Sequence, residues 1–240
     1  MENLLVTNNY ASLNEAEDIM VVYDETTDLV WIKTPQPLCG FVDLGLPSGL
    51  KWATCNLGAN APEDFGLYFQ WGDTLGYTID DVNKGLKQFT FNDYKHISGG
   101  TFFTKYNTNS LSGTVDNKLV LELVDDAAYK NDNTCRMPTK AEIEELAANI
   151  TYTWETLNGV KGGRFTSNIN GNSFFVPAAA YISNGKYAYN GIGTFGYIES
   201  SSLYETYPRN QWHYIFDSSD AYMSNGIRNE GYPIRPVRFK

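Results

Sequence analysis

The chain has 240 residues, with 28 acidic against 18 basic side chains and a formal net charge of −10. This negative charge argues against a nucleic acid or an anionic membrane surface as partner, because both repel an acidic protein. Aromatic residues reach 15%, and no apolar run is long enough to cross a membrane. The composition therefore predicts a folded domain with a large core. It excludes a chain that is mostly disordered and a chain that spans a membrane.

The first 36 residues differ from the rest, since residues 1–33 hold a single basic residue, Lys33, among many acids. Two β-rich runs, 19–23 and 29–32, flank the polar segment 24–28, which predicts a β-hairpin. Two strands alone are marginally stable in water. We therefore expect residues 1–36, the N-terminal arm, to dock on the main domain, on another subunit or on a larger assembly.

One helix is strongly predicted over residues 139–150. Thr139 and Glu142 have the spacing of a capping box, and Ile143, Leu146 and Ile150 recur on one helical face. A shorter helix is predicted over 121–130. Elsewhere glycines break the chain into short β-type runs, so the sequence predicts an α+β domain over residues 37–240.

The start of the chain and its cysteines bear on location. The N-terminus turns polar after three apolar residues and has no basic region, which is not the pattern of a secretory signal. Cys39, Cys55 and Cys135 form no CxxC motif and are odd in number. We expect buried, reduced thiols and a chain folded in a reducing cytoplasm.

A series of short motifs resembles the Fibrobacter succinogenes major paralogous domain, a family widespread in gut Bacteroidales and their phages. In chain order they are VDLGLPSG (42–49), KWATCNLGA (51–59), YFQWGD (68–73), KYN (105–107), DDAA (125–128), RMPT (136–139), FFVPAA (174–179) and IRPVR (234–238). The first 36 residues lie outside the resemblance. Two departures are Cys135, where the family often has Trp, and Tyr-Ile-Glu-Ser at 197–200 in place of Tyr-Trp-Ser-Ser.

This resemblance implies a C-type-lectin-like fold, similar to that of formylglycine-generating enzymes and of variable proteins of diversity-generating retroelements. Two helices would flank small mixed or antiparallel sheets, and long irregular loops would carry the binding surface. The helices predicted over 121–130 and 139–150 fit this pattern. The arginines near the C-terminus, Arg235 and Arg238, would be structural, because the family closes its sheet there.

Catalytic chemistry finds little support. Formylglycine-generating enzymes bind copper through two late cysteines, and no cysteine follows Cys135. A Ser-His-Asp set would have to use His96 or His213. Asp217 and Asp220 could act as an acid–base pair or hold a structural calcium ion, but Asp-Ser-Ser-Asp is more typical of a turn. We expect no catalytic residues and no cofactor, with structural calcium left open.

The C-terminal third is rich in Tyr, Asn and Ser, the residues of adaptable binding surfaces. Aromatic rings also suit the C–H faces of sugars, and amides suit their hydroxyl groups. The alternative is that these tyrosines only pack a small β domain. The expected ligand contacts are Tyr187, Tyr189, Asn190, Tyr197, Glu199, Tyr204, Tyr207, Arg209, Asn210, Trp212, His213, Tyr222, Asn225, Arg228 and Asn229.

These features predict a non-enzymatic recognition protein on the surface of a phage virion, in a tail or head fibre. It would bind a host surface glycan or protein receptor, and the N-terminal arm would contact other virion proteins. A homo-oligomer is expected, with a trimer favoured. The alternative is a secreted or cell-surface lectin-like adhesin of gut Bacteroidales, and an oxygenase or glycosidase is a distant third.

Overall fold

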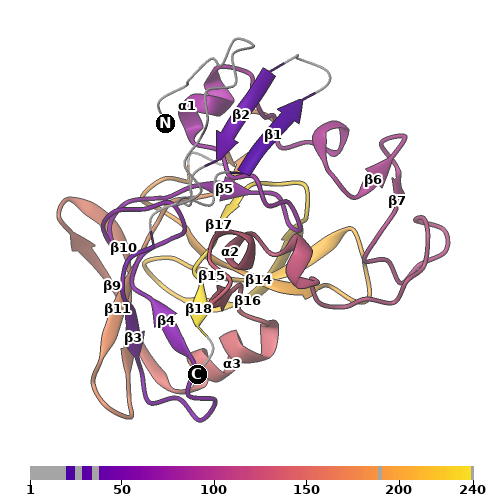
Figure 1. Ribbon diagram of the computed structural model, residues 1–240. Coiled ribbons are helices and arrows are strands. Elements are labelled where there is room, and N and C mark those ends of the chain that lie inside the picture. The colour runs from indigo at the N-terminus through magenta and orange to yellow at the C-terminus, as the bar shows by residue number, and fades with distance from the viewer. Residues whose placement is uncertain (1–19, 25–28, 34–37, 189–190, 239–240) are drawn as a thin grey trace. The chain divides into compact units, whose positions relative to one another are not determined.

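The computed structural model describes residues 20–24, 29–33, 38–188 and 191–238. The chain divides into two units, Met1–Gln36 and Pro37–Lys240. The secondary structure is mixed α+β, with short helices and mostly small antiparallel sheets, as the sequence predicts (Figure 1). A membrane-spanning helix needs about 20 residues, and among the described residues no helix combines such length with sufficient hydrophobicity.

The first unit contains the expected hairpin. Strands β1 (Met20–Asp24) and β2 (Leu29–Lys33) pair antiparallel, with Met20 opposite Lys33 and Asp24 opposite Leu29. The residues between the two strands lie outside the described part. The docking role expected of the N-terminal arm stays a prediction.

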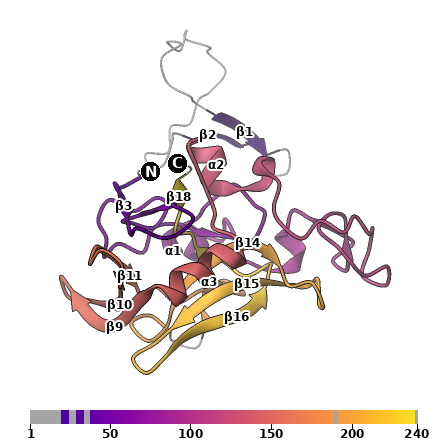
Figure 2. The same ribbon diagram turned by 90° about the horizontal axis from the view of Figure 1, so that it is seen from below.

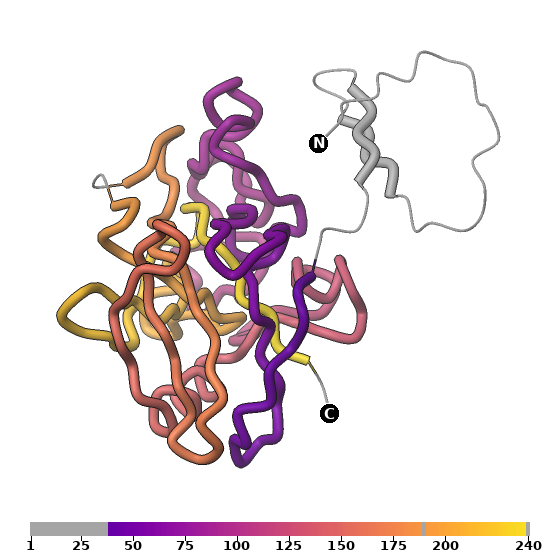
Figure 3. Tube along the Cα trace, turned by 90° about the vertical axis from the view of Figure 1, so that its left-hand side faces the viewer, coloured from indigo at the N-terminus to yellow at the C-terminus, as the bar shows by residue number. Residues whose placement is uncertain are grey.

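In the second unit, a four-stranded sheet joins the beginning of the unit to its end. Its order is β3 (Phe41–Asp43), β4 (Lys51–Ala53), β18 (Val237–Arg238) and β8 (Cys135–Arg136), with all neighbours antiparallel. In Figure 3 the C-terminal segment runs beside the strands at the beginning of this unit. The C-terminal strand β18 therefore lies inside this sheet, between β4 and β8.

Two antiparallel meanders make up most of the remaining sheet. The first consists of β9 (Ile150–Leu157), β10 (Val160–Ser167) and β11 (Ser173–Pro177), and the second of β14 (Gly196–Leu203), β15 (Asn210–Phe216) and β16 (Ala221–Ile227). Asn158 and Gly159 join β9 to β10 with positive φ, as a primed hairpin turn requires. Short pairs complete the β structure: β5 (Tyr68–Phe69) with β17 (Tyr232–Pro233), β6 (Ile97–Ser98) with β7 (Phe102–Phe103), and β12 (Ile182–Ser183) with β13 (Lys186–Tyr187).

The strongly predicted helix is α3 (Lys140–Ala148). Thr139 is its N-cap, and Thr139 and Glu142 form the predicted capping box. The helix ends before the predicted residue 150 because Ile150 begins strand β9. Figure 2 shows α3 lying across the β14–β16 sheet, where Ile143 and Leu146 enter the same apolar core as Ile198, Tyr214 and Phe216.

We expect Thr139→Ala to lower the free energy of unfolding by about 1 kcal/mol, because it leaves backbone N–H groups at the helix start without an acceptor. Urea denaturation followed by circular dichroism measures the change. Thr153→Ala is the matched control, because Thr153 is exposed on β9 and a surface change of this kind stays within about 0.5 kcal/mol. Equal losses in both variants would show that the cap contributes nothing.

The prediction of one continuous helix over 121–130 is wrong. The structure has a 3-10 turn, η2 (Leu123–Asp125), followed by α2 (Ala127–Asn131). Asp126 separates them, because its backbone is extended and its carboxylate accepts the N–H groups of Ala128 and Tyr129 as the N-cap of α2. A further helix, α1 (Ile79–Asn83), was not predicted.

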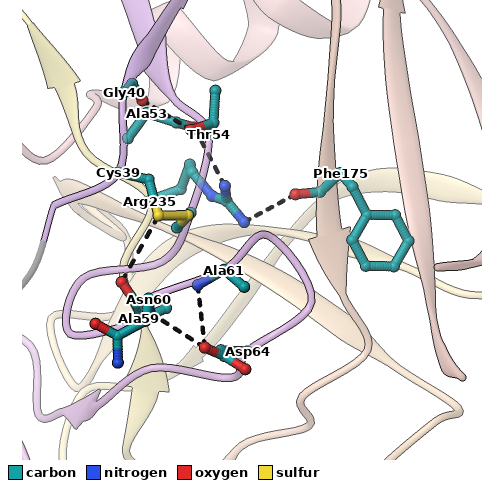
Figure 4. The surroundings of a disulfide bond; sticks show 11 residues. Cys39, Gly40, Ala53, Thr54, Ala59, Asn60, Ala61, Asp64, Phe175 and Arg235 are labelled. Carbon is teal, nitrogen blue, oxygen red and sulfur yellow. Dashed lines mark hydrogen bonds between the residues drawn. A yellow bond between two sulfur atoms is a disulfide. The ribbon is translucent and has the colours of Figure 1, made fainter. Parts of the chain in front are cut away.

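The expectation of three reduced cysteines is wrong as well. Cys39 and Cys55 form a disulfide with their Cα atoms 5.4 Å apart (Figure 4). Cys135 is a buried free thiol. The cause is the register of the β3–β4 hairpin. Phe41 lies opposite Ala53, and the same register carried two residues further sets position 39 opposite position 55.

Candidate functional site

The loop between β14 and β15, residues 204–209, is tied down by hydrogen bonds at both ends. The N–H of Tyr204 donates to the carbonyl of Asn210 at 3.0 Å, and the N–H of Tyr207 donates to the carbonyl of Tyr204 at 3.2 Å. The Thr108 hydroxyl donates to the carbonyl of Glu205 at 3.0 Å. Side chains on this loop are therefore presented on a fixed backbone.

An aromatic pair, Tyr204 and Trp212, lies at the base of this loop. The two rings are 4.8 Å apart at an angle of 72°, and both are half-buried. The Trp212 indole N–H donates to Glu205 at 3.0 Å, and this hydrogen bond lowers the pKa of the Glu205 carboxyl. The Lys140 ammonium lies 4.8 Å from the centre of the Trp212 ring. We call Tyr204 and Trp212 the aromatic shelf.

Polar groups border the aromatic shelf. Asn225 on β16 lies opposite Trp212, and the Asn210 amide donates to the Asn225 side-chain oxygen at 2.6 Å. Tyr207 at the loop tip is 53% exposed. The structure thus brings together five of the expected ligand contacts at the start of β15: Tyr204, Tyr207, Asn210, Trp212 and Asn225. Arg209 lies opposite Arg228 in the same ladder and stacks on Phe91, on the other face of the sheet. Rings with amides beside them can stack on a sugar and hydrogen-bond to its hydroxyl groups.

Three expected contacts, Tyr197, Glu199 and His213, lie instead inside the protein, so their predicted surface position is wrong. They share the face of the β14–β16 sheet that Tyr232 covers. The centre of the Tyr232 ring lies 5.2 Å from that of Tyr197 and 5.1 Å from that of His213. Gly226 permits this approach, since a Cβ there would meet the Tyr232 hydroxyl at 2.3 Å. Burial lowers the pKa of His213 to about 3, so the imidazole is neutral at physiological pH.

Glu199 is the most unusual of these buried groups. Its side chain is fully buried, and neither carboxyl oxygen has a hydrogen-bond partner among the described residues. Burial, with Asp126 nearby, raises the pKa of this carboxyl well above its ordinary value. Glu199 is therefore a neutral acid in the interior, because an unpaired buried carboxylate would cost far more.

Arg228 and Asn229 are also buried, which corrects their expected surface position. The Arg228 guanidinium donates to the carbonyl of Tyr106 at 2.8 Å and lies 3.7 Å from the centre of the Phe103 ring. The Asn229 amide donates to the carbonyl of Phe89 at 3.2 Å. Both side chains satisfy the backbone of neighbouring loops and are not available to a ligand.

The remaining expected contacts lie apart from the aromatic shelf. Tyr187 on β13 packs edge-on against Tyr68, with the two ring centres 5.8 Å apart. Tyr222 is 51% exposed but pairs with Ile215, on the face of the sheet opposite to Trp212. The last two, Tyr189 and Asn190, lie outside the described residues.

Two residues at the site were not predicted from the sequence: Lys140 and Glu205. Lys140 reaches Trp212 because α3 packs on β15, a tertiary contact with no local signal. Glu205 follows Tyr204 directly, so its position in the loop could have indicated it.

The Asp217–Asp220 segment is the turn that the sequence favours. The Asp217 carboxylate accepts the N–H groups of Ser219 at 2.7 Å and Asp220 at 3.1 Å, between β15 and β16. In the part of the chain that the structure describes, no three His, Cys, Asp or Glu side chains gather as a metal site requires. A structural calcium ion stays an open prediction.

A scan against models of known families, a search of the curated proteins and a search of the solved structures return no match to this chain. The family resemblance therefore stands on the sequence motifs alone.

Proposed function

We propose that this chain is a non-enzymatic recognition protein of a phage particle. Its second unit would be a C-type-lectin-like domain that binds a glycan on the surface of the host bacterium. The observation that carries the proposal is the aromatic shelf, with the amides of Asn210 and Asn225 beside it. The motif resemblance to a family found in gut Bacteroidales and their phages supports the phage setting.

The physical argument concerns what such a site prefers. An aromatic ring offers area for stacking at little cost in conformational entropy, and its partly buried position excludes water from the contact. The Trp212 indole N–H is already satisfied by Glu205. The part of the Trp212 ring that Tyr204 and Lys140 leave uncovered would therefore contact the ligand without leaving a polar group unpaired. The amides then supply donors and acceptors that match sugar hydroxyl groups.

The N-terminal arm completes the proposal. It would attach the protein to other virion proteins or to further copies of the chain, with a trimer favoured. Support comes from its β-hairpin and from its separation as a unit of its own, because two strands gain stability by adding to a larger sheet. The binding domain would then be displayed on the virion surface.

Fluorescently labelled protein tests the proposal on gut Bacteroidales strains with and without their capsular polysaccharide. We expect binding to a few strains, lost with the capsule, and weakened about tenfold or more by Trp212→Ala, which removes roughly 1.4 kcal/mol or more of stacking. Tyr207→Ala and Tyr222→Ala form a matched pair, since the two side chains are 53% and 51% exposed. Only Tyr207→Ala should weaken binding. Equal effects of the matched pair would place the site elsewhere.

The second candidate is a secreted or cell-surface adhesin, which the Cys39–Cys55 disulfide favours. Disulfides form and persist in oxidising compartments, among them the bacterial periplasm. The two candidates differ in where the protein is found. Recovery of the chain in purified virions supports the first, and recovery in the cell envelope of uninfected bacteria supports the second.

A further inference from the structure

The β14–β16 sheet has two outer edges, which differ in how they are covered. Along β14, the N–H of Leu121 donates to the carbonyl of Ser201 at 2.9 Å. The N–H of Leu203 donates to the carbonyl of Leu119 at 2.8 Å, so residues 119–121 occupy this edge. The other edge is β16, the outermost of the three strands in Figure 2. None of its seven residues is fully buried, so this edge lies at the surface.

The hydrogen-bond pattern shows which backbone groups of β16 point to this edge. In an antiparallel pair, residues that bond to the partner strand alternate with residues whose N–H and C=O groups point away from it. Asp217 bonds to Asp220, and Arg228 bonds to Arg209, across the β15–β16 pair. The register between these two pairs has no shift. The even-numbered residues of β16 therefore bond to β15, and the backbone groups of its odd-numbered residues point outward.

At both ends of β16 the outward groups already have partners. The N–H of Ala221 donates to the carboxylate of Asp220 at 2.7 Å. The Tyr214 hydroxyl donates to the carbonyl of Ala221 at 3.1 Å. The carbonyl of Ile227 accepts the N–H of Glu230 at 3.0 Å. These contacts limit the open part of the edge to the middle of the strand.

The middle of this edge is complementary to itself. Among the described residues, nothing bonds to the N–H and C=O groups of Met223 and Asn225, which lie on either side of Ser224. A two-fold axis through Ser224 pairs Met223 of one copy with Asn225 of another, and the reverse. Each of these two pairs can form two backbone hydrogen bonds. A second copy therefore satisfies all the open groups of both residues.

The composition of β16 also favours a second copy. Proteins usually protect a long edge strand with charged side chains, a proline or a bulge. The seven residues of β16 include none of these, in a chain whose net charge is −10. By contrast, β9, the outer strand of the other meander, carries Glu155. Two copies of β16 can therefore pair without bringing like charges together.

We infer that the chain forms a two-fold pair, in which β16 adds antiparallel to β16 of a second copy. The two sheets join into one continuous sheet, with Ser224 of both copies at the axis. This contact is separate from the one proposed for the N-terminal arm and does not depend on glycan binding. The axis stands perpendicular to the joined sheet, so the same face of both copies lies on one side. In the proposed function, the pair would therefore present two aromatic shelves to one surface and bind it bivalently.

Charge-swap variants of the full chain test the pairing. Cβ atoms directly opposite each other lie about 4.5–5.5 Å apart, so Ser224→Glu and Ser224→Lys each place like charges across the axis. In sedimentation velocity, each variant should have half the mass of wild type, with the dissociation constant of the pair raised about tenfold or more. An equimolar mixture should recover the wild-type mass, because Glu then lies opposite Lys. Thr153→Glu adds the same charge at an exposed position of β9 and should leave the mass unchanged.

Hydrogen exchange of wild type is a second measurement, which decides the matter even if a variant fails to fold. The amides of Met223 and Asn225 should exchange about tenfold or more slowly in concentrated than in dilute protein, because pairing protects them. The amide of Trp154 is the matched control, since the same alternation directs it outward from β9. It should exchange at one rate at both concentrations.

Several results would overturn the inference. Wild type and Ser224→Glu could have the same mass at every concentration, or the Met223 and Asn225 amides could exchange fast throughout, and either result would show that the edge stays open. An equal loss of mass in Thr153→Glu would place the contact at β9. Loss of pairing in both variants at position 224, without recovery in their mixture, would assign the edge to a different strand, such as one of the N-terminal arm.

Discussion

Replacing both disulfide cysteines, Cys39→Ser with Cys55→Ser, is expected to lower the free energy of unfolding by about 3 kcal/mol, the value for a loop of this size. The two residues are 16 positions apart in sequence. The bond restricts the unfolded chain, and in the folded chain it fastens the segment before β3 to the end of β4, beside the buried Arg235. Denaturation in guanidinium chloride measures the loss.

Reductant provides the control for this prediction. Dithiothreitol should lower the stability of wild type to that of the double variant and leave the double variant unchanged. Thiol titration of the unfolded, unreduced protein should find one free thiol, that of Cys135. Three free thiols, with no effect of reductant on wild type, would contradict the disulfide and restore the expectation of reduced cysteines.

Glu199→Gln is expected to stabilise the protein, and increasingly so as the pH rises above 4.5. The folded-state pKa of Glu199 is raised above 4.5, so its contribution to stability is intact at low pH and is lost as pH rises toward the folded-state pKa. In that interval the unfolded state ionises and the folded state does not. The advantage of the variant should grow by about 1.4 kcal/mol per pH unit.

Urea denaturation of wild type and Glu199→Gln between pH 4 and 8 measures this advantage. Glu144→Gln is the matched control, because Glu144 is exposed on α3. Parallel stability profiles for wild type and Glu199→Gln would show that Glu199 is solvated or paired in solution, contrary to its position in the structure.

The parts of the fold that follow from local sequence were predictable. The capping box of Thr139 and Glu142 and the apolar stripe behind it define α3 without reference to the rest of the chain. The same signal, Thr78 with Asp81, marks α1 and was overlooked. The Cys39–Cys55 pairing could not be read from the sequence, because it depends on the register of two short strands.

Only part of the candidate site was predictable, because the sequence does not show which face of a strand is exposed. Strand alternation separates Trp212 from His213, but both faces of the β14–β16 sheet are covered, one by α3 and the other by Tyr232 and its neighbours. A strand covered on both faces shows no contrast between polar and apolar positions. The ligand contacts predicted from composition therefore included buried residues such as Tyr197 as well as the surface residues of the β14–β15 loop.

The most direct test of the proposed glycan site is isothermal titration calorimetry with capsular polysaccharide purified from a strain that the protein binds. Wild type and Tyr222→Ala should bind with the same affinity, and Trp212→Ala should bind at least tenfold more weakly. Equal affinities for wild type and Trp212→Ala would contradict the account, because the aromatic shelf would then play no part in recognition.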